Sequence, residues 1–168
     1  VRYADDFVIL CKTANQATFA IKTAREKLGK LKLTVAEEKT RIAHVSDGFT
    51  FLGHTFWKYK GTLYTFPSDK AVCSFKDKVR HVTRRQQPRN IKMVIEKLNP
   101  IVQGWGNYFS RGNGKQRFER LDEWTRMRLR AFILKERRVS VRAHTKYPNS
   151  FFRELGLVFL LDRMAQKP

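Results

Sequence analysis

The chain has 168 residues, of which 42% are hydrophobic, enough to bury a core in one large domain or two small ones. Its formal net charge of +20 and its pI near 10.5 indicate a polyanionic partner, with nucleic acid favoured over an anionic membrane surface. No apolar run approaches the ~20 residues of a membrane-spanning helix, and the N-terminus has no signal pattern. We therefore expect a cytoplasmic protein without a membrane partner.

The cysteines and histidines argue against two further classes of protein. Cys11 and Cys73 form no CxxC pair, and the four histidines are scattered at spacings that do not suit metal ligands. We expect neither a disulfide framework nor a zinc site. The sequence opens with Val1, directly in a strand-like run, so we also expect it to be a piece of a longer protein.

The first predicted element is a β-hairpin. Residues 2–4 and 7–12 are apolar runs of β-branched and aromatic residues, and Asp5 and Asp6 lie between them at the expected turn. Apolar residues then recur at helical spacing over residues 15–28, which predicts an amphipathic helix with Gly29 as its C-terminal stop.

Short strands are predicted next. Residues 31–35 and 41–45 read as strands joined by a polar turn, and residues 49–59 and 62–66 read as a strand pair connected by Lys60 and Gly61.

Helical patterns replace strand patterns after Pro67 and Ser68. We predict helices over residues 69–85, 90–110 and 116–137, with Pro100 causing a kink or a restart capped by Asn99. Their apolar faces should pack as a small bundle, onto which the tail docks. The residues expected to pack are Ile91, Val94, Ile95, Leu98, Val102, Trp105, Phe109, Leu121, Trp124, Leu129, Phe132 and Ile133, with Phe151, Phe152, Leu155, Leu157 and Phe159 from the tail.

The predicted fold class is α+β in two domains, residues 1–67 and residues 68–168. Charge follows the same division, because residues 1–75 have a net charge of +5 whereas residues 76–142 have a net charge of +13. The polyanion should therefore bind mainly to the helical part.

The sequence Tyr3-Ala4-Asp5-Asp6 carries the sharpest chemical signal. Nucleotidyl transfer needs carboxylates on a rigid element to hold Mg²⁺ against a triphosphate, and a β-turn of this kind suits that task. An ordinary exposed turn is the alternative, since Asp favours turns through hydrogen bonds to its own backbone.

Four ordered motifs give the chain a family resemblance. The YADD sequence is followed by Glu38-Lys39-Thr40 and by a GFxFLG segment from Gly48 to Gly53. After these come Leu98-Asn99-Pro100, Gly104-Trp105, Asn107-Tyr108-Phe109, Phe118, Leu121-Asp122 and Trp124. The set resembles the reverse transcriptases and maturases encoded by group II introns, and it covers most of residues 2–132. The resemblance implies the end of a polymerase palm followed by a helical thumb, the maturase-specific domain.

The resemblance also implies roles for individual residues. Asp5 and Asp6 correspond to the palm carboxylates that bind Mg²⁺ in the complete polymerase, and Lys39 corresponds to the lysine proposed to protonate the leaving pyrophosphate. The segment Phe51, Leu52 and Gly53 corresponds to the turn that supports the primer. In this family a further carboxylate comes from an earlier strand, so we expect this chain alone not to polymerise and not to hold Mg²⁺ by itself.

Arginine outnumbers lysine in the helical part, which suits phosphate and base contacts with structured RNA. The expected partners are group II intron RNA and an RNA/DNA primer-template, and the alternative to a polymerase fragment is a non-enzymatic RNA-binding maturase module. We expect Trp105 and Trp124 to be core residues. The residues expected to bind RNA are Arg84, Arg85, Arg89, Lys92, Arg111, Lys115, Arg117, Arg120, Arg126, Arg128, Arg130, Arg137, Arg138 and Arg142.

Overall fold

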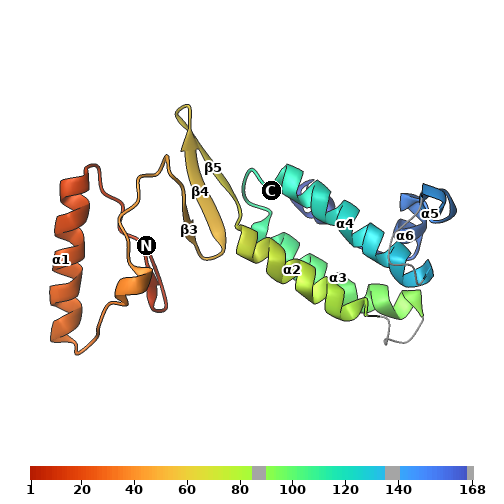
Figure 1. Ribbon diagram of the computed structural model, residues 1–168, viewed down its shortest axis with the longest axis horizontal. Helices are drawn as coiled ribbons and strands as arrows, with labels where there is room; N and C mark the ends of the chain where they lie inside the picture. The colour runs from red at the N-terminus through yellow and green to blue at the C-terminus, as the bar shows by residue number, and fades with distance from the viewer. Residues whose placement is uncertain (85–89, 135–140, 166–168) are drawn as a thin grey trace.

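A computed structural model describes residues 1–84, 90–134 and 141–165, and it has the predicted α+β character. Three parts follow one another along the long axis in Figure 1: an N-terminal part, a β-meander and a helical bundle. The N-terminal part contains β1 (Arg2–Tyr3), β2 (Asp6–Phe7), α1 (Ala14–Lys30) and η1 (Glu37–Lys39). The meander contains β3 (Phe49–Phe51), β4 (His54–Tyr59) and β5 (Thr62–Pro67). The bundle contains α2 (Asp69–Val82), α3 (Ile91–Phe109), α4 (Lys115–Leu134), α5 (Val141–Lys146), α6 (Asn149–Glu154) and α7 (Leu160–Ala165).

The predicted N-terminal hairpin is confirmed, although its strands are shorter than expected. β1 and β2 pair antiparallel, with Arg2 opposite Phe7 and Tyr3 opposite Asp6. A two-residue turn of Ala4 and Asp5 joins them, and Ala4 takes the left-handed backbone conformation at φ 51°. The strand predicted over residues 7–12 ends at Phe7, because no further strand pairs with it in the described part of the chain.

Helix α1 is confirmed, but the predicted stop at Gly29 is wrong. Thr13 caps its start by accepting a hydrogen bond from the Gln16 N–H. Gly29 remains helical, and Lys32 is the residue that reverses the chain at φ 57°. The Lys32 N–H donates to the Gly29 carbonyl and the Leu33 N–H donates to the Leu28 carbonyl, which is the hydrogen-bond pattern of a Schellman ending.

Two predicted strands are wrong. Residues 31–35 and 41–45 pair with no strand among the described residues and are irregular, apart from the 3₁₀-turn η1 between them. A β-branched sequence favours extended backbone, but a strand also needs a neighbour that satisfies its N–H and C=O groups.

The β-meander contains three strands where two were predicted. The single strand expected over residues 49–59 is broken at Leu52 and Gly53, whose φ values are 48° and 75°. Lys60 and Gly61 form the second turn, as predicted, with φ values of 47° and 81°. Two-residue hairpin loops with positive φ at both positions match the twist of the strands that they join.

The predicted helices of the bundle are confirmed to within three residues where their ends are described. Ser68 caps α2 by accepting from the Ala71 N–H, and Asn90 caps α3 by accepting from the Lys92 N–H. Their apolar faces meet in one core, together with α4 and the C-terminal segments. The buried core residues are Phe75, Val79, Val94, Ile95, Leu98, Val102, Phe109, Phe118, Leu121, Leu129, Ala143, Phe152, Leu157, Phe159 and Leu160.

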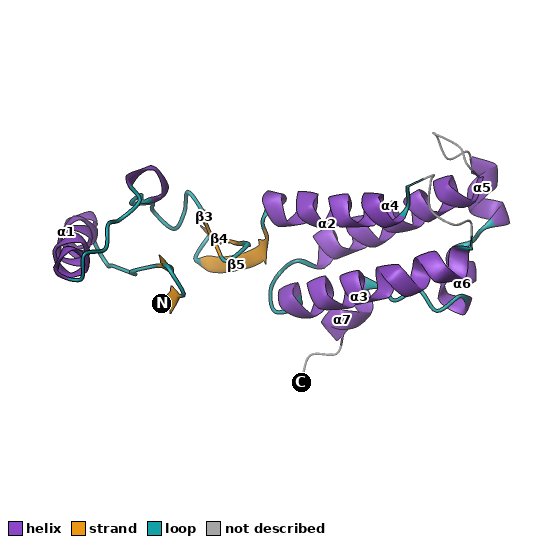
Figure 2. Cartoon of the chain, turned by 90° about the horizontal axis from the view of Figure 1, so that it is seen from below, coloured by secondary structure: helices purple, strands orange, loops and turns teal. Residues whose placement is uncertain are grey.

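The tail docks on the bundle as predicted, and Asn99 is the residue that fastens it. α3 continues through Pro100 without a restart, so the predicted capping role of Asn99 is wrong. Its side chain instead donates to the Gly156 carbonyl at 2.9 Å and accepts from the Val158 N–H at 3.0 Å. Figure 2 shows α7 lying against α3.

Asp122 fastens the same tail from α4. It is 4% exposed, and its carboxylate oxygens accept hydrogen bonds from the Leu160 and Leu161 N–H groups at the start of α7. Burial raises the pKa of Asp122, and these two hydrogen bonds and the nearby Arg126 charge oppose that rise. In the described parts of the chain no helix combines the length and apolar character needed to cross a membrane.

Candidate nucleic-acid interface

The acidic hairpin presents its two carboxylates to solvent. Asp5 lies on the turn, whereas Asp6 begins β2 opposite Tyr3, and both are exposed. Among the described residues no three His, Cys, Asp or Glu side chains gather closely enough to hold a metal ion. The described residues therefore do not form a complete two-metal site by themselves.

Lys39 ends the short turn η1 and is exposed. No hydrogen bond or ion pair joins it to Asp5 or Asp6 in the described part of the chain. The structure thus places these three predicted catalytic residues in the N-terminal part without assembling them into one site.

The turn of Leu52 and Gly53, which follows Phe51, is held in place by helix α3. The Tyr108 hydroxyl donates to the Leu52 carbonyl at 2.9 Å. A Cβ atom on Gly53 would lie 3.3 Å from the ring of Phe109, so the backbone of this turn packs closely on α3. The Asn107-Tyr108-Phe109 motif and the Leu52-Gly53 motif are therefore in direct contact, which their sequence separation gave no means to predict.

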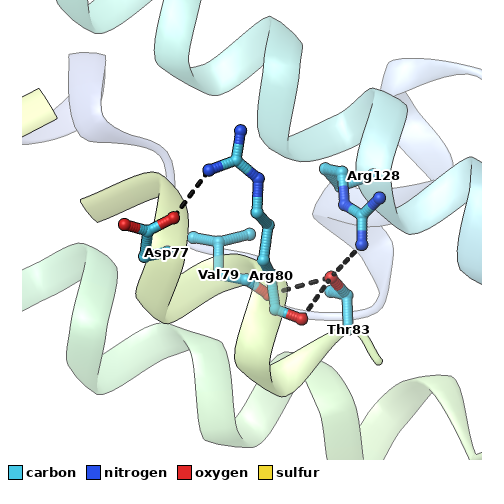
Figure 3. Close-up of polar contacts among 5 residues, drawn as sticks. All are labelled: Asp77, Val79, Arg80, Thr83 and Arg128. Carbon is cyan, nitrogen blue, oxygen red and sulfur yellow. Dashed lines mark hydrogen bonds and ion pairs between the residues drawn. The ribbon is translucent and has the colours of Figure 1, made fainter. Parts of the chain in front are cut away.

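Helices α2 and α4 lie side by side and run in the same direction. Near their starts, Arg117 forms an ion pair with Asp69 at 2.6 Å. Near the end of α2, the Arg128 guanidinium donates to the Thr83 hydroxyl at 3.2 Å, as Figure 3 shows. Asp69 and Thr83, at the two ends of α2, thus contact Arg117 and Arg128 in the same order along α4. The two helices are therefore parallel neighbours.

A band of basic side chains follows this line of contact. Between the two ends, the charged groups of Lys76 and Arg80 lie 5.5 and 5.4 Å from the ring centre of Trp124. On α4, Arg117, Arg120, Trp124 and Arg128 share one face, because three, four and four residues separate them. We call the band the cationic seam, and it consists of Lys76, Arg80, Arg117, Arg120, Trp124 and Arg128.

Two carboxylates partly neutralise the seam. Asp69 pairs with Arg117, and Asp77 pairs with Arg80 at 2.6 Å, as drawn in Figure 3. Five basic groups against two acidic ones leave a surplus of positive charge on this face. Arg117 to Arg128 spans about 16 Å along α4, the length of roughly five nucleotides of one strand.

Not every predicted RNA-binding arginine belongs to the surface. Arg130 is only 2% exposed, donates to the Tyr147 carbonyl and the Asn149 side chain, and stacks on the Phe152 ring. Burial and the neighbouring Arg126 charge lower its pKa. Its surface role was therefore predicted wrongly, since the pattern of charges cannot reveal an arginine that satisfies buried backbone groups.

Arg126 is also partly withdrawn from the surface. It is half-buried over the Phe159 ring, and burial lowers its pKa, although Asp122 and Glu123 raise it.

The other predicted RNA-binding residues divide into exposed and undescribed ones. The exposed residues are Arg84, Lys92, Arg111, Lys115 and Arg120. Arg85, Arg89, Arg137 and Arg138 lie outside the described residues, as does the side chain of Arg142. Lys76 and Arg80 were missed, although their spacing of four residues within a predicted helix was the available signal. Trp105 packs in the core as predicted, whereas Trp124 lies at the core's edge, under the seam cations.

Comparisons with known proteins match two successive parts of the chain. Residues 1–56 match the reverse transcriptase (RNA-dependent DNA polymerase) family, and residues 72–148 match the group II intron, maturase-specific domain. A reverse transcriptase segment thus precedes a group II intron maturase-specific segment, in agreement with the resemblance of the sequence motifs. Protein YkfC of Escherichia coli (strain K12) is 38% identical over an alignment of 78 residues that covers 42% of this chain. The match covers 20% of YkfC, so the chain spans about a fifth of that relative's length.

Proposed function

We propose that the chain binds the phosphate backbone of structured group II intron RNA along the cationic seam and so assists folding of the intron for splicing. The seam supports this function because its positive charges lie in a row, at helical spacing, on two helices fixed side by side. Each lysine or arginine placed against a phosphate releases condensed counterions, which adds affinity without reading sequence. Intron RNA is made inside the bacterial cell or organelle, and the proposal places the chain there.

Solvation alone is the competing explanation for a charged helix face. A surface that serves only solubility mixes both signs, whereas residues 76–142 have 19 basic and 6 acidic side chains. Self-repulsion of this surplus favours a polyanionic partner. The exposed residues Arg84, Lys92, Arg111 and Lys115 are proposed as flanking phosphate contacts.

The test measures the salt dependence of RNA binding. In the double variant Lys76→Gln with Arg80→Gln, the plot of log affinity against log salt should become shallower by about 1 to 2 units, because two phosphate contacts are lost. The matched control is Lys78→Gln with Lys97→Gln, which removes the same charge from exposed positions off the seam. An equal change of this slope in both double variants would show that the cationic seam has no special role in RNA binding.

For the complete protein we propose RNA-templated DNA synthesis, with Asp5 and Asp6 as Mg²⁺ ligands and Lys39 as the proton donor to pyrophosphate. The position of the YADD sequence on a paired hairpin supports this role. Phe51, Leu52 and Gly53 would support the primer end, held by α3 through Tyr108.

A primer-extension assay separates this proposal from the non-enzymatic RNA-binding module. The 168-residue chain should not extend a primed template with Mg²⁺ and nucleotides, because the described residues bring no third carboxylate to Asp5 and Asp6. A form that supplies the further carboxylate should extend it, and Asp5→Asn should abolish the extension. Loss of extension in the Asp5→Asn variant, without loss of RNA affinity, supports a catalytic role for Asp5. Absence of extension from every form supports the non-enzymatic RNA-binding module.

A further inference from the structure

One face of the β-meander carries a cluster of exposed aromatic rings. Trp57 and Tyr59 lie two residues apart on β4, and their rings stack with centres 5.1 Å apart and an angle of 19° between their planes. Tyr64, the cross-strand partner of Trp57, packs beside it at 5.9 Å. The exposed fractions of Trp57 and Tyr59 are 37% and 47%, so this ring stack is open to solvent.

The ring stack is held by the protein at its inner end, Trp57, and is open at its outer end, Tyr59. The Trp57 indole N–H donates to the Ser46 carbonyl at 2.8 Å, and the ring also packs against Gly48. At the outer end, the Lys60 ammonium lies 5.4 Å from the centre of the Tyr59 ring. Lys60 is an exposed side chain on the hairpin turn, and it can swing aside for another flat ring.

The aromatic face continues into the cationic seam. Phe66 of β5 lies on the same face as Tyr64, because side chains two residues apart on a strand point to the same side. The Arg117 guanidinium, where the seam begins, lies 4.6 Å from the centre of the Phe66 ring. A pocket of about 660 Å³ opens beside this junction, lined in part by Thr50, Thr55 and Lys70.

We infer that this aromatic face binds unpaired bases of an RNA whose backbone continues along the cationic seam. The inference rests on the proposed RNA-binding function and adds a second kind of contact to it. Rings stack with any base, and each step of two residues along β5 advances ~6.6 Å, so successive bases can follow the strand. The net charge of +20, with Lys60 and Arg117 at the two ends of the face, suits a polyanion.

The test replaces the outermost ring. Tyr59→Ala should weaken binding of a single-stranded oligoribonucleotide of about 12 nucleotides by at least about fivefold, while Tyr59→Phe, which keeps the ring, should bind as the wild type does. The control is Leu63→Ala on the opposite face of the same hairpin, where Leu63 is 52% exposed. Fluorescence anisotropy measures the affinities, and thermal unfolding checks that all variants fold.

A fully paired RNA duplex of the same length distinguishes this inference from the function on which it rests. Duplex binding should be equal in wild type and Tyr59→Ala, because paired bases cannot stack on the rings. Equal single-strand affinities for Tyr59→Ala and Leu63→Ala would overturn the aromatic site and leave seam binding intact. Failure of the wild type to bind either RNA would overturn the proposed function together with this inference.

Discussion

At the scale of single residues, polar side chains of the maturase motif mainly hold the C-terminal tail on the bundle. Asn99 and Asp122 each accept backbone hydrogen bonds from the segment after Leu155, across 38 to 59 residues of sequence. Their motif positions could be read from the sequence, but their roles could not. A local capping role for Asn99 was the obvious expectation because its actual partners are far away in the chain.

Replacing Asn99 by alanine should lower the free energy of unfolding by about 1 to 3 kcal/mol. The variant leaves the Val158 N–H and the Gly156 carbonyl without their partner at a partly buried site. Urea unfolding measures the change, with Asn107→Ala, an exposed position on the same helix, as the control. A loss no larger than that of the control would contradict the fastening role.

The raised pKa of Asp122 predicts a pH dependence of stability. Its carboxyl favours the folded state fully below the unfolded pKa of 3.8, and that contribution is lost as pH rises through the higher folded pKa. The stability of the wild type relative to Asp122→Asn should therefore fall as pH rises above about 4, and then level off. Urea unfolding of both proteins from pH 4 to pH 8 gives this difference, and a difference that grows with pH would refute the raised pKa.

At the scale of secondary structure, strands were predicted less well than helices. Helix periodicity and capping residues are local, so α2 and α3 were placed within a few residues. Residues 49–59 contain only one turn-favouring residue, Gly53. Its neighbour Leu52 also has a positive φ, which a leucine does not indicate in the sequence. The break depends on α3, which holds the turn through Tyr108 and Phe109, and that contact is not encoded nearby.

Two glycine replacements separate the turn from its contact with α3. Gly53→Ala and Gly61→Ala both place a Cβ at positive φ, which costs about 1 to 2 kcal/mol in either turn. Only Gly53→Ala also pushes a Cβ to 3.3 Å from buried Phe109, whereas nothing lies within 4 Å at Gly61. Thermal unfolding should therefore show a larger decrease in stability for Gly53→Ala than for Gly61→Ala. Equal decreases would mean that the Phe109 ring can move aside without a free-energy penalty.

At the scale of the whole molecule, burial is concentrated in the C-terminal part. No residue before Pro67 is buried, and many large apolar side chains of residues 1–42 are exposed. The α+β class and the change to helices after Pro67 could be predicted from periodicity and charge, and the division into two domains there stays a prediction. The alignment of α2 with α4, and so the seam, depends on packing that sequence patterns do not specify.

This distribution of burial predicts the order of limited proteolysis. A protease should cut within residues 31–48 before it cuts within α2, α3 or α4, because a segment without buried contacts opens at little free-energy cost. Mass spectrometry of early digests identifies the fragments. Early cleavage inside those three helices would show that the bundle is no more stable than the N-terminal part.

The parallel alignment of α2 and α4 has a further electrostatic effect. Both helices begin beside β5, where the Asn113 N–H donates to the Thr65 carbonyl, while α3 ends near the same place, as Figure 1 shows. Helix macrodipoles, each equal to about half a charge at either terminus, cancel in antiparallel pairs, whereas the amino ends of the parallel helices α2 and α4 add at this place. The positive potential of these amino ends comes from peptide groups, so it does not depend on the charges of lysines and arginines.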